Sequence, residues 1–251
     1  MNKLLLPLAV SSVLISGFAQ ADSLSSGIKA AMKSEIRSEK ETMRDRNRKP
    51  VRTLEFFGIK DDMKVLELIP GRGWYTKLLA PALAEKGQYY VSIGTSRVSK
   101  NVLNQAGFEK AKVLSPKTNM SYNKELGGYQ LNDINFDVST LDAVLTFRNY
   151  HNLTEESRKR LNKAAYDALA PGGIYGVIDH TRRHMQKDND ENGRRFDPVL
   201  AIKEIEQAGF DFVDYSNLHY RADDELRYEV GRKTVTGNTD RFTFLFKKPA
   251  K

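Results

Sequence analysis

Short apolar runs recur along the chain and alternate with stretches in which apolar residues are spaced three or four positions apart. The apolar runs of strand length lie at residues 65–69, 88–93, 112–114, 141–147, 174–178, 210–215 and 241–248. The helical spacing is found at residues 74–84, 98–108, 154–169 and 197–208. Short apolar runs bounded by glycine turns are typical of buried strands, and the wider spacing is typical of amphipathic helices. Their alternation predicts an α/β protein built on a parallel sheet.

The clearest local motif joins the first strand to the first helix. The apolar run at 65–69 is followed by a tight turn at 70–73, in which Gly71 and Gly73 lack a Cβ and allow a ligand to approach the backbone. The N-terminus of the next helix offers free N–H groups to a negative or polar group. Ligands of open parallel sheets bind where strands end and helices begin, so this turn is a candidate binding site. Glu67 is a carboxylate in an apolar run, and its burial is costly unless it has a partner.

The segment from Glu67 to Gly73 resembles the first motif of class I S-adenosylmethionine-dependent methyltransferases, acid-x-Gly-x-Gly-x-Gly, with Ile69 in place of the first glycine. Together with RNYHNL at 148–153 and IDH at 178–180, the string PGRGWYTKLLAPAL at 70–83 is similar to a group of exported bacterial predicted methyltransferases. The resemblance implies a Rossmann-like, doubly wound α/β domain over residues 53–251. Its sheet would have seven mostly parallel strands, with the last strand antiparallel.

The resemblance also implies a function and a set of site residues. The function would be transfer of a methyl group from S-adenosylmethionine to an unknown small molecule in the cell envelope. The residues expected to contact the cofactor are Glu67, Gly71, Gly73, Tyr75, Thr76 and Asn149. The candidate catalytic residues are His151, Asp179 and His180, with His151 at the reacting end and Asp179 or His180 facing the acceptor.

Each of these residues also has a structural interpretation. Glu67 can bond backbone N–H groups of the turn, and Tyr75 can simply pack at the helix start. Asn149 can be a turn former, and His151 a packing histidine rather than a base. The second strand also departs from the nucleotide-binding pattern, because Ile93-Gly94-Thr95-Ser96 replaces the acid that usually binds ribose hydroxyls. Thr95 or Ser96 would donate there instead, and Thr76 at the third dinucleotide glycine argues against a nicotinamide cofactor.

Two other classes of function compete with methyl transfer. A non-catalytic periplasmic protein would keep the pocket for another ligand, which Ile69 and the acid-free second strand favour. A metal-dependent enzyme would use His151, His180 and Asp179 as a two-histidine, one-carboxylate set. We expect no metal, because imidazole and carboxylate groups at a strand edge are frequent without one. A serine hydrolase is disfavoured because the Gly-x-Ser-x-Gly motif is missing from the sequence.

The first 52 residues predict an export signal and a helical arm. Lys3, an apolar core at 4–18 and the small-x-small site Ala19-Gln20-Ala21 indicate a secretory signal over residues 1–21, with an uncleaved anchor as the alternative. We therefore expect a periplasmic protein that begins near Asp22 and has no membrane span after cleavage. Residues 22–52 predict helices lying over the domain, either as a packed cap, which we favour, or as a lid. In the lid, Arg44 or Arg48 would face the pocket.

Composition and charge limit the classes of molecule that the protein is expected to bind. The 251 residues include 40 Lys and Arg against 32 Asp and Glu, a net charge of +8. The basic residues are mostly dispersed, which favours a solvated surface over nucleic-acid binding and leaves a small-molecule substrate. The sequence has no cysteine, which excludes a disulfide, a thiolate metal site and a cysteine nucleophile.

Overall fold

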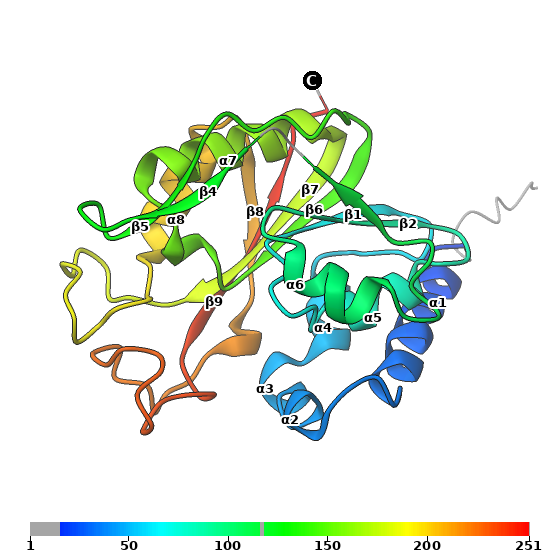
Figure 1. Ribbon diagram of the computed structural model, residues 1–251, viewed down its shortest axis with the longest axis horizontal. Helices are drawn as coiled ribbons and strands as arrows, with labels where there is room; N and C mark the ends of the chain where they lie inside the picture. Colours follow the sequence, from blue (N-terminus) through cyan, green and yellow to red (C-terminus); the bar gives the residue numbers. More distant parts are fainter. Residues whose placement is uncertain (1–15, 116–117, 251) are drawn as a thin grey trace, which may run out of the picture.

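A central sheet organises the part of the chain that the computed structural model describes, residues 16–115 and 118–250, with side chains from residue 23 onward. The sheet has seven strands in the order β3-β2-β1-β6-β7-β9-β8 (Figure 1). These strands are β1 (Lys64–Leu68), β2 (Gln88–Ser92), β3 (Lys112–Leu114), β6 (Leu141–Phe147), β7 (Leu169–His180), β8 (Asp211–Tyr215) and β9 (Arg241–Lys247). Each overlaps an apolar run of the sequence, but β7 begins five residues before its predicted run at 174–178.

The pairing of the strands confirms the expected topology. β1 pairs in parallel with β2 and β6, and β6 pairs in parallel with β7. β9 lies antiparallel between β7 and β8, so the last strand is the antiparallel one. The strand order reverses between β1 and β6, and open α/β sheets bind ligands in the crevice at such a point. A ligand-binding site is therefore expected at the edge of the sheet formed by the carboxyl ends of β1, β2, β6 and β7.

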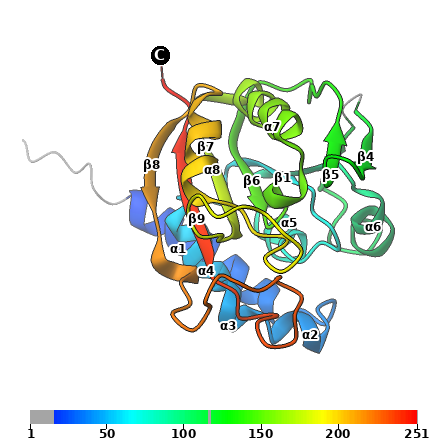
Figure 2. The same cartoon turned by 90° about the vertical axis from the view of Figure 1, so that its left-hand side faces the viewer.

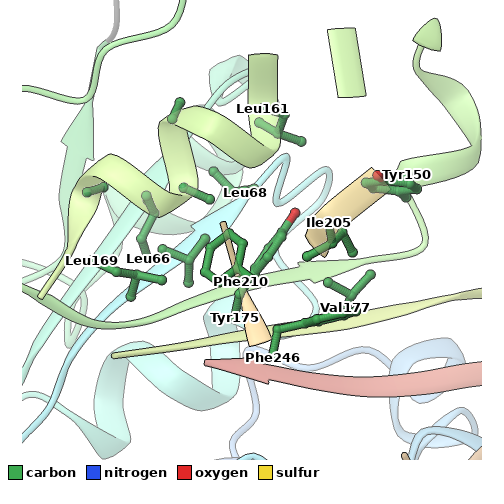
Figure 3. Packing of buried hydrophobic residues seen from close by; sticks show 14 of the residues in the cluster. Leu66, Leu68, Tyr150, Leu161, Leu169, Tyr175, Val177, Ile205, Phe210 and Phe246 are labelled. Carbon is green, nitrogen blue, oxygen red and sulfur yellow. The ribbon is translucent and has the colours of Figure 1, made fainter. Parts of the chain in front are cut away.

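Helices cover both faces of the sheet and enclose two hydrophobic cores. One face carries α1 (Ser16–Met32), α4 (Pro50–Phe56) and α5 (Thr76–Ala82), and the other carries α7 (Glu155–Ala168) and α8 (Pro198–Glu206). Figure 3 shows the core beneath α7 and α8, in which Leu161 of α7 and Ile205 of α8 pack over Leu66 and Tyr175 of the sheet. In the core beneath α1, α4 and α5, Ile28 of α1 is fully buried with residues of α5 and β6. The N-terminal arm therefore shares a core with the sheet.

Two connections differ from the sequence expectation. Residues 115–135, expected to be irregular, contain an antiparallel hairpin of β4 (Met120–Asn123) and β5 (Gly128–Leu131). The hairpin is possible because Gly127 takes a positive φ of 64° at the turn, and Tyr122 packs edge-on against Tyr129 across the strands. The helix expected at 98–108 is reduced to α6 (Ser96–Val98) and a π-helical turn, η1 (Ser99–Leu103). Such π-helical turns are frequent at functional sites.

The N-terminal region is only partly described. Residues 1–15 of the expected signal segment lie outside the described residues, and α1 runs from Ser16 through the expected cleavage site. Just beyond that site, Ser23 Oγ donates to Asp61 Oδ2 at 2.6 Å and Leu24 is buried. The expected boundary at residues 52 and 53 lies inside α4. Among the described helices, none combines the length and apolar character that a membrane crossing requires.

Candidate functional site

Three residues with a left-handed backbone lie directly after three neighbouring strands. Ile69 follows β1 with φ 52°, Ile93 follows β2 with φ 61°, and Arg148 follows β6 with φ 61°. This conformation costs a residue with a Cβ about 1–2 kcal/mol and is least favourable for a β-branched side chain. Strained backbone of this kind clusters at functional sites. Ile69, at the position of the motif's first glycine, thus adopts a left-handed conformation that glycine reaches without steric cost.

Three adjoining hollows lie along this edge of the sheet. The hairpin hollow, about 380 Å³, lies between the ends of β1 and β2 and the β4–β5 hairpin. The turn hollow, about 200 Å³, surrounds the glycine turn and shares Ile69, Gly71 and Asn149 with the first. The arginine hollow, about 280 Å³, shares Arg44, Arg48 and Arg148 with the turn hollow. A ligand of extended shape can therefore run from the end of β2, past the turn, to the end of β7.

The two glycines of the turn have different surroundings. A Cβ on Gly71, whose φ is 60°, would meet no atom within 4 Å, and this residue lines both the turn and hairpin hollows. A Cβ on Gly73 would lie 2.8 Å from Val98 Cγ2 and 3.1 Å from Val102 Cγ2. Gly71 leaves room for a ligand, whereas Gly73 lets α6 and η1 pack against the turn. Gly73 is not among the residues that line the three hollows.

Glu67 is the buried acid behind the turn. Its Oε2 accepts hydrogen bonds from Thr76 Oγ1 at 2.8 Å and from the Tyr89 hydroxyl. Burial raises the pKa of Glu67 to about 7, against the lowering effect of those two bonds and of the Arg48 charge. Glu67 lines the turn hollow, and no described residue donates to its Oε1. Thr76 is fully buried, so it contacts Glu67 rather than the hollow.

Aromatic packing fixes the wall of the turn hollow. The Tyr75 ring stacks on Phe147 with a centroid distance of 3.6 Å and meets Trp74 edge-on at 4.7 Å. Tyr75 is 4% exposed and lines the turn hollow, so it is both a packing residue and part of the wall. Asn149 Nδ2 donates to Ile69 O at 3.0 Å and to Phe147 O at 3.1 Å. Asn149 therefore ties the ends of β1 and β6 together while lining two hollows.

His151 and Asp179 form a hydrogen-bonded pair beside the arginine hollow. His151 Nδ1 lies 2.6 Å from Asp179 Oδ1, and Asp179 also accepts from the backbone N–H groups of His151 and His180 at 2.8 and 2.7 Å. Asp179 has no exposed surface and lies behind His151, so His180, the other residue expected to face the acceptor, is the one that lines the hollow. An ionised Asp179 fixes the proton of His151 on Nδ1 and leaves Nε2 as an acceptor. The His151 ring lines the hollow, which makes it a candidate base.

His180 lines the same hollow as a neutral imidazole. Its Nδ1 lies 2.8 Å from Thr239 Oγ1, and its ring centroid is 5.7 Å from that of His151. Burial and the charge of Arg241 hold the pKa of His180 well below its usual value. Because His180 stays neutral at physiological pH, it presents a hydrogen-bonding group without adding a charge.

The N-terminal arm contributes directly to the site. Trp74 Nε1 donates to Glu41 O at 3.0 Å, and the Arg48 guanidinium lies 4.2 Å from the centroid of the Trp74 ring. Arg44 and Arg48 line both the turn and the arginine hollows. The arm also reaches the loop at 220–240, where Asn47 Nδ2 donates to Gly237 O at 2.7 Å (Figure 2). The expectation of a packed cap is thus incomplete, because the arm both packs and supplies site residues.

The two remaining histidines, His184 and His219, have hydrogen-bond partners of their own. His184 Nδ1 lies 3.0 Å from Asp197 Oδ2, at the start of α8. His219 is buried between Thr243 Oγ1 at 2.7 Å and Arg48 O at 3.1 Å, and burial lowers its pKa to about 4. Across the described ranges, no group of three or more His, Cys, Asp or Glu side chains is placed to hold a metal ion.

The hairpin hollow lies at the end of β2, where the sequence lacks an acid. After β2 its lining is Gly94, Ser96 and Arg97, and the hairpin contributes Met120 and Tyr129. No carboxylate is part of this lining, which agrees with the acid-free second strand of the sequence. The polar residues that line it are Ser96, Arg97, Tyr129, Asn149 and Asn152, of which Ser96 and Tyr129 carry hydroxyl groups.

Comparison with known proteins identifies the fold. No protein-family model and no curated protein sequence matches the chain. Solved structures do match: a SAM dependent methyltransferase from Aquifex aeolicus has a TM-score of 0.55 and 18% identity over 89% of this chain and 97% of that one. A chain of the Haloferax volcanii complex between the Trm112 methyltransferase activator and a methyltransferase has a TM-score of 0.56 and 13% identity, over 93% and 98%. The [4+2]-cyclase SpnF has a TM-score of 0.54 and 14% identity, over 92% and 95%.

These likenesses show a shared architecture. The chain has the Rossmann-like fold of the class I methyltransferases, with the seven-stranded sheet and antiparallel last strand expected from its sequence. SpnF has the same fold and is named for a cyclisation, which illustrates that a fold alone does not fix a reaction. The reaction therefore depends on the hollows and on the residues that line them.

Several site residues carry no recognisable signal in the sequence. Arg241 begins β9 and Thr239 lies two residues before it, about sixty residues beyond His180; only Arg241 belongs to the run at 241–248, whose alternation predicts a strand. Tyr89 belongs to β2 and is identified as a partner of Glu67 only through its hydroxyl contact. The polar loop at 181–193 does not line the three hollows, although Arg194 just after it lines the arginine hollow.

Proposed function

We propose that the protein is an S-adenosylmethionine-dependent methyltransferase that acts on a small molecule in the cell envelope. The observation that carries the proposal is the row of three adjoining hollows, with an open glycine turn in the middle and the His151–Asp179 pair at one end. This row offers separate places for a cofactor and an acceptor that meet beside Arg148 and Asn149. The likeness to methyltransferase structures supports the same choice.

The residues present fit the cofactor. Gly71 leaves open space where any other residue would carry a Cβ, and Glu67 Oε1 borders that space without a donor from the described chain. Glu67, Gly71 and Asn149 would hold the methionine part, and Ser96 or Tyr129 the ribose. When bound, S-adenosylmethionine supplies an electrophilic methyl group on a sulfonium sulfur.

The protein's own task is to place the acceptor and to take up its proton. His151 Nε2 is free to accept that proton, because Nδ1 is engaged by Asp179. Asp179 acts as a positioning residue that fixes the ring and stabilises the imidazolium that forms. The buried aromatic wall of Tyr75 and Phe147 excludes water from the meeting point of the hollows.

Calorimetry with S-adenosylhomocysteine tests cofactor binding. We expect saturable binding with one site per chain, and His151→Asn should bind as tightly as the wild type because His151 does not line the turn or hairpin hollow. Native mass spectrometry of protein purified from its own compartment should reveal the same ligand. A flat titration at millimolar ligand, together with a different retained molecule, would instead identify a binding protein.

The cellular location is a second part of the proposal. The charge, apolar core and small-x-small pattern of residues 1–21 support export, and Ser23 and Leu24 pack just after the expected cleavage site. Mass spectrometry of the N-terminus of protein from the periplasmic fraction should give Asp22. A chain that keeps Met1 in the cytoplasmic fraction would exclude an envelope role.

A further inference from the structure

The arginine hollow concentrates positive charge on residues that are far apart in the sequence. Its lining includes Arg44 and Arg48 from the arm, Arg148 after β6, Arg194, and Arg241 at the start of β9. The described residues that line it include no aspartate or glutamate. Five cationic side chains around one space of about 280 Å³ create a strongly positive site.

Three of these arginines form no direct ion pair with any carboxylate of the described chain. Arg48 and Arg241 are only 5% and 6% exposed, and Arg148 is partly buried. Within residues 23–115 and 118–250, none of the three forms an ion pair with a carboxylate. Arg241 Nε is buried without a hydrogen-bond partner there, and Arg241 Nη1 has only Asn47 O at 3.3 Å. Buried guanidinium groups are normally paired, so this arrangement is costly unless a ligand supplies the charge.

Carboxylates close to the hollow are already engaged by other groups. Asp179 accepts from His151 and two backbone N–H groups, and Glu229 pairs with Arg194. Burial and the neighbouring Arg148 lower the pKa of both Arg48 and Arg241, that of Arg241 to about 10. A guanidinium group is not deprotonated in proteins at neutral pH, so all three arginines carry their charge. The cluster therefore repels itself in the absence of an anion.

We propose that the arginine hollow binds the anionic part of the methyl acceptor, a small molecule with at least two negatively charged carboxylate or phosphate groups. Guanidinium groups bind both kinds of group through paired N–H donors. An anion held by Arg241 and Arg148 would place the rest of the acceptor beside His151 and the turn hollow. That the bound anion is the methyl acceptor rests on the proposed function. That the hollow binds an anion does not.

The position of Arg241 distinguishes an acceptor site from a cofactor site. Arg44, Arg48 and Arg148 line both the arginine and the turn hollows, so a cofactor carboxylate would have access to them. Arg241 and His180 line the arginine hollow alone. A ligand that needs Arg241 is therefore bound beyond the reach of a molecule confined to the turn and hairpin hollows.

Calorimetric titration of the purified protein with inorganic pyrophosphate and with citrate tests the proposal, in a buffer with enough salt to screen non-specific attraction. We expect saturable binding of at least one probe, with phosphate and carboxylate acceptors distinguished by which probe binds more tightly. Arg241→Gln should weaken binding roughly ten- to hundredfold, as expected for the loss of charge-assisted hydrogen bonds. Arg241→Lys should weaken it less. The matched control Arg183→Gln, an exposed arginine outside the hollow, should bind as the wild type does.

A second titration separates this proposal from the proposed function. The probe and S-adenosylhomocysteine should bind together, and Arg241→Gln should leave the affinity for S-adenosylhomocysteine unchanged. Competition between the two would assign the arginines to the cofactor, and absence of saturable binding of either probe to the wild type would overturn the anion site. Equal losses in Arg241→Gln and Arg183→Gln would also overturn it. Probe binding without S-adenosylhomocysteine binding would keep the anion site and contradict only the methyltransferase proposal.

Discussion

At the scale of single residues, the glycine turn combines a binding position with a packing position. Gly71→Ala should cost about 1 kcal/mol of unfolding free energy for its positive φ and should weaken binding of S-adenosylhomocysteine, since Gly71 lines two hollows. Gly73→Ala should cost about 2–4 kcal/mol, because its Cβ would also overlap Val98. Urea unfolding and calorimetry of both variants measure the two effects. Equal stability losses would contradict the division of roles.

The raised pKa of Glu67 makes stability depend on pH in a definite direction. A carboxyl whose pKa is about 7 in the folded state and about 4.5 in the unfolded chain holds its proton more tightly when folded. Its contribution to stability is therefore present below pH 4.5 and is lost as the pH rises through about 7. The shift corresponds to roughly 2–3 kcal/mol between pH 5 and pH 8.

The variant Glu67→Gln isolates this effect, because its amide oxygen can still accept from Thr76 and Tyr89 but cannot ionise. Urea unfolding at pH 5 and pH 8 should show wild type losing roughly 2 kcal/mol more than the variant over that interval. The exposed control Glu206→Gln should follow the wild type. If Glu67→Gln and wild type changed in parallel, Glu67 would be ionised throughout.

Residue patterns predicted part of this site and missed the rest for a physical reason. Gly71, Asn149 and His151 were recognisable because each follows a strand that apolar periodicity reveals. Arg241 was not recognisable as a site residue, because an arginine at the start of an alternating strand is most often exposed. The role of Asp179 depends on the direction of one side chain, which points to His151 and two backbone N–H groups. Such directions are set by tertiary packing, not by local sequence.

At the scale of elements, the N-terminal arm is held to the turn by a small set of polar contacts. Lys77 Nζ of α5 lies 2.8 Å from Glu41 Oε2 and also donates to Ile36 O at 3.0 Å. The Lys77 and Glu41 side chains are 11% and 17% exposed, so their interaction is less screened than that of a surface pair. This pair joins α2 (Glu39–Thr42) to the helix that follows the glycine turn.

Glu41→Gln should therefore loosen the arm. We expect a loss of about 1–2 kcal/mol in unfolding free energy and faster hydrogen exchange at residues 37–49. Asp167→Asn, which removes an exposed i,i+4 pair with Lys163, should cost no more than about 0.5 kcal/mol. Mass spectrometry measures the hydrogen-exchange rate of the backbone amides of the arm directly. Unchanged exchange at 37–49 would mean that apolar contacts alone hold the arm.

Element positions were predicted better than element shapes. The seven sheet strands lie where apolar runs occur. The inner strands are apolar because both of their faces are buried, whereas the edge strands β3 and β8 are largely exposed. The β4–β5 hairpin was missed because its residues are polar and largely exposed, which gives no apolar run. The helix expected at 98–108 has apolar spacing but ends early as a π-helical turn, whose geometry depends on packing against Gly73.

At the scale of the whole molecule, the site exists only because distant segments meet. The arginine hollow joins the arm, the end of β6 and the start of β9, so Arg48 and Arg241 are brought together across most of the chain. The arm also shares a hydrophobic core with α5 and β6, where Ile28 is fully buried. Loss of the arm would expose that core and open two hollows at once. Folding and assembly of the site are therefore one process.

Trp74 offers a direct test of this coupling, because it is the single tryptophan of the sequence and lies at the junction of arm and turn. It is 7% exposed, packed under Arg48 and beside Tyr75. Urea transitions followed by Trp74 fluorescence and by far-ultraviolet circular dichroism should coincide, as expected for one cooperative unit. A fluorescence transition at lower urea would show that the arm opens before the sheet unfolds. Saturating pyrophosphate should shift both curves together to higher urea, because an anion that bridges the arm and β9 stabilises only the complete structure.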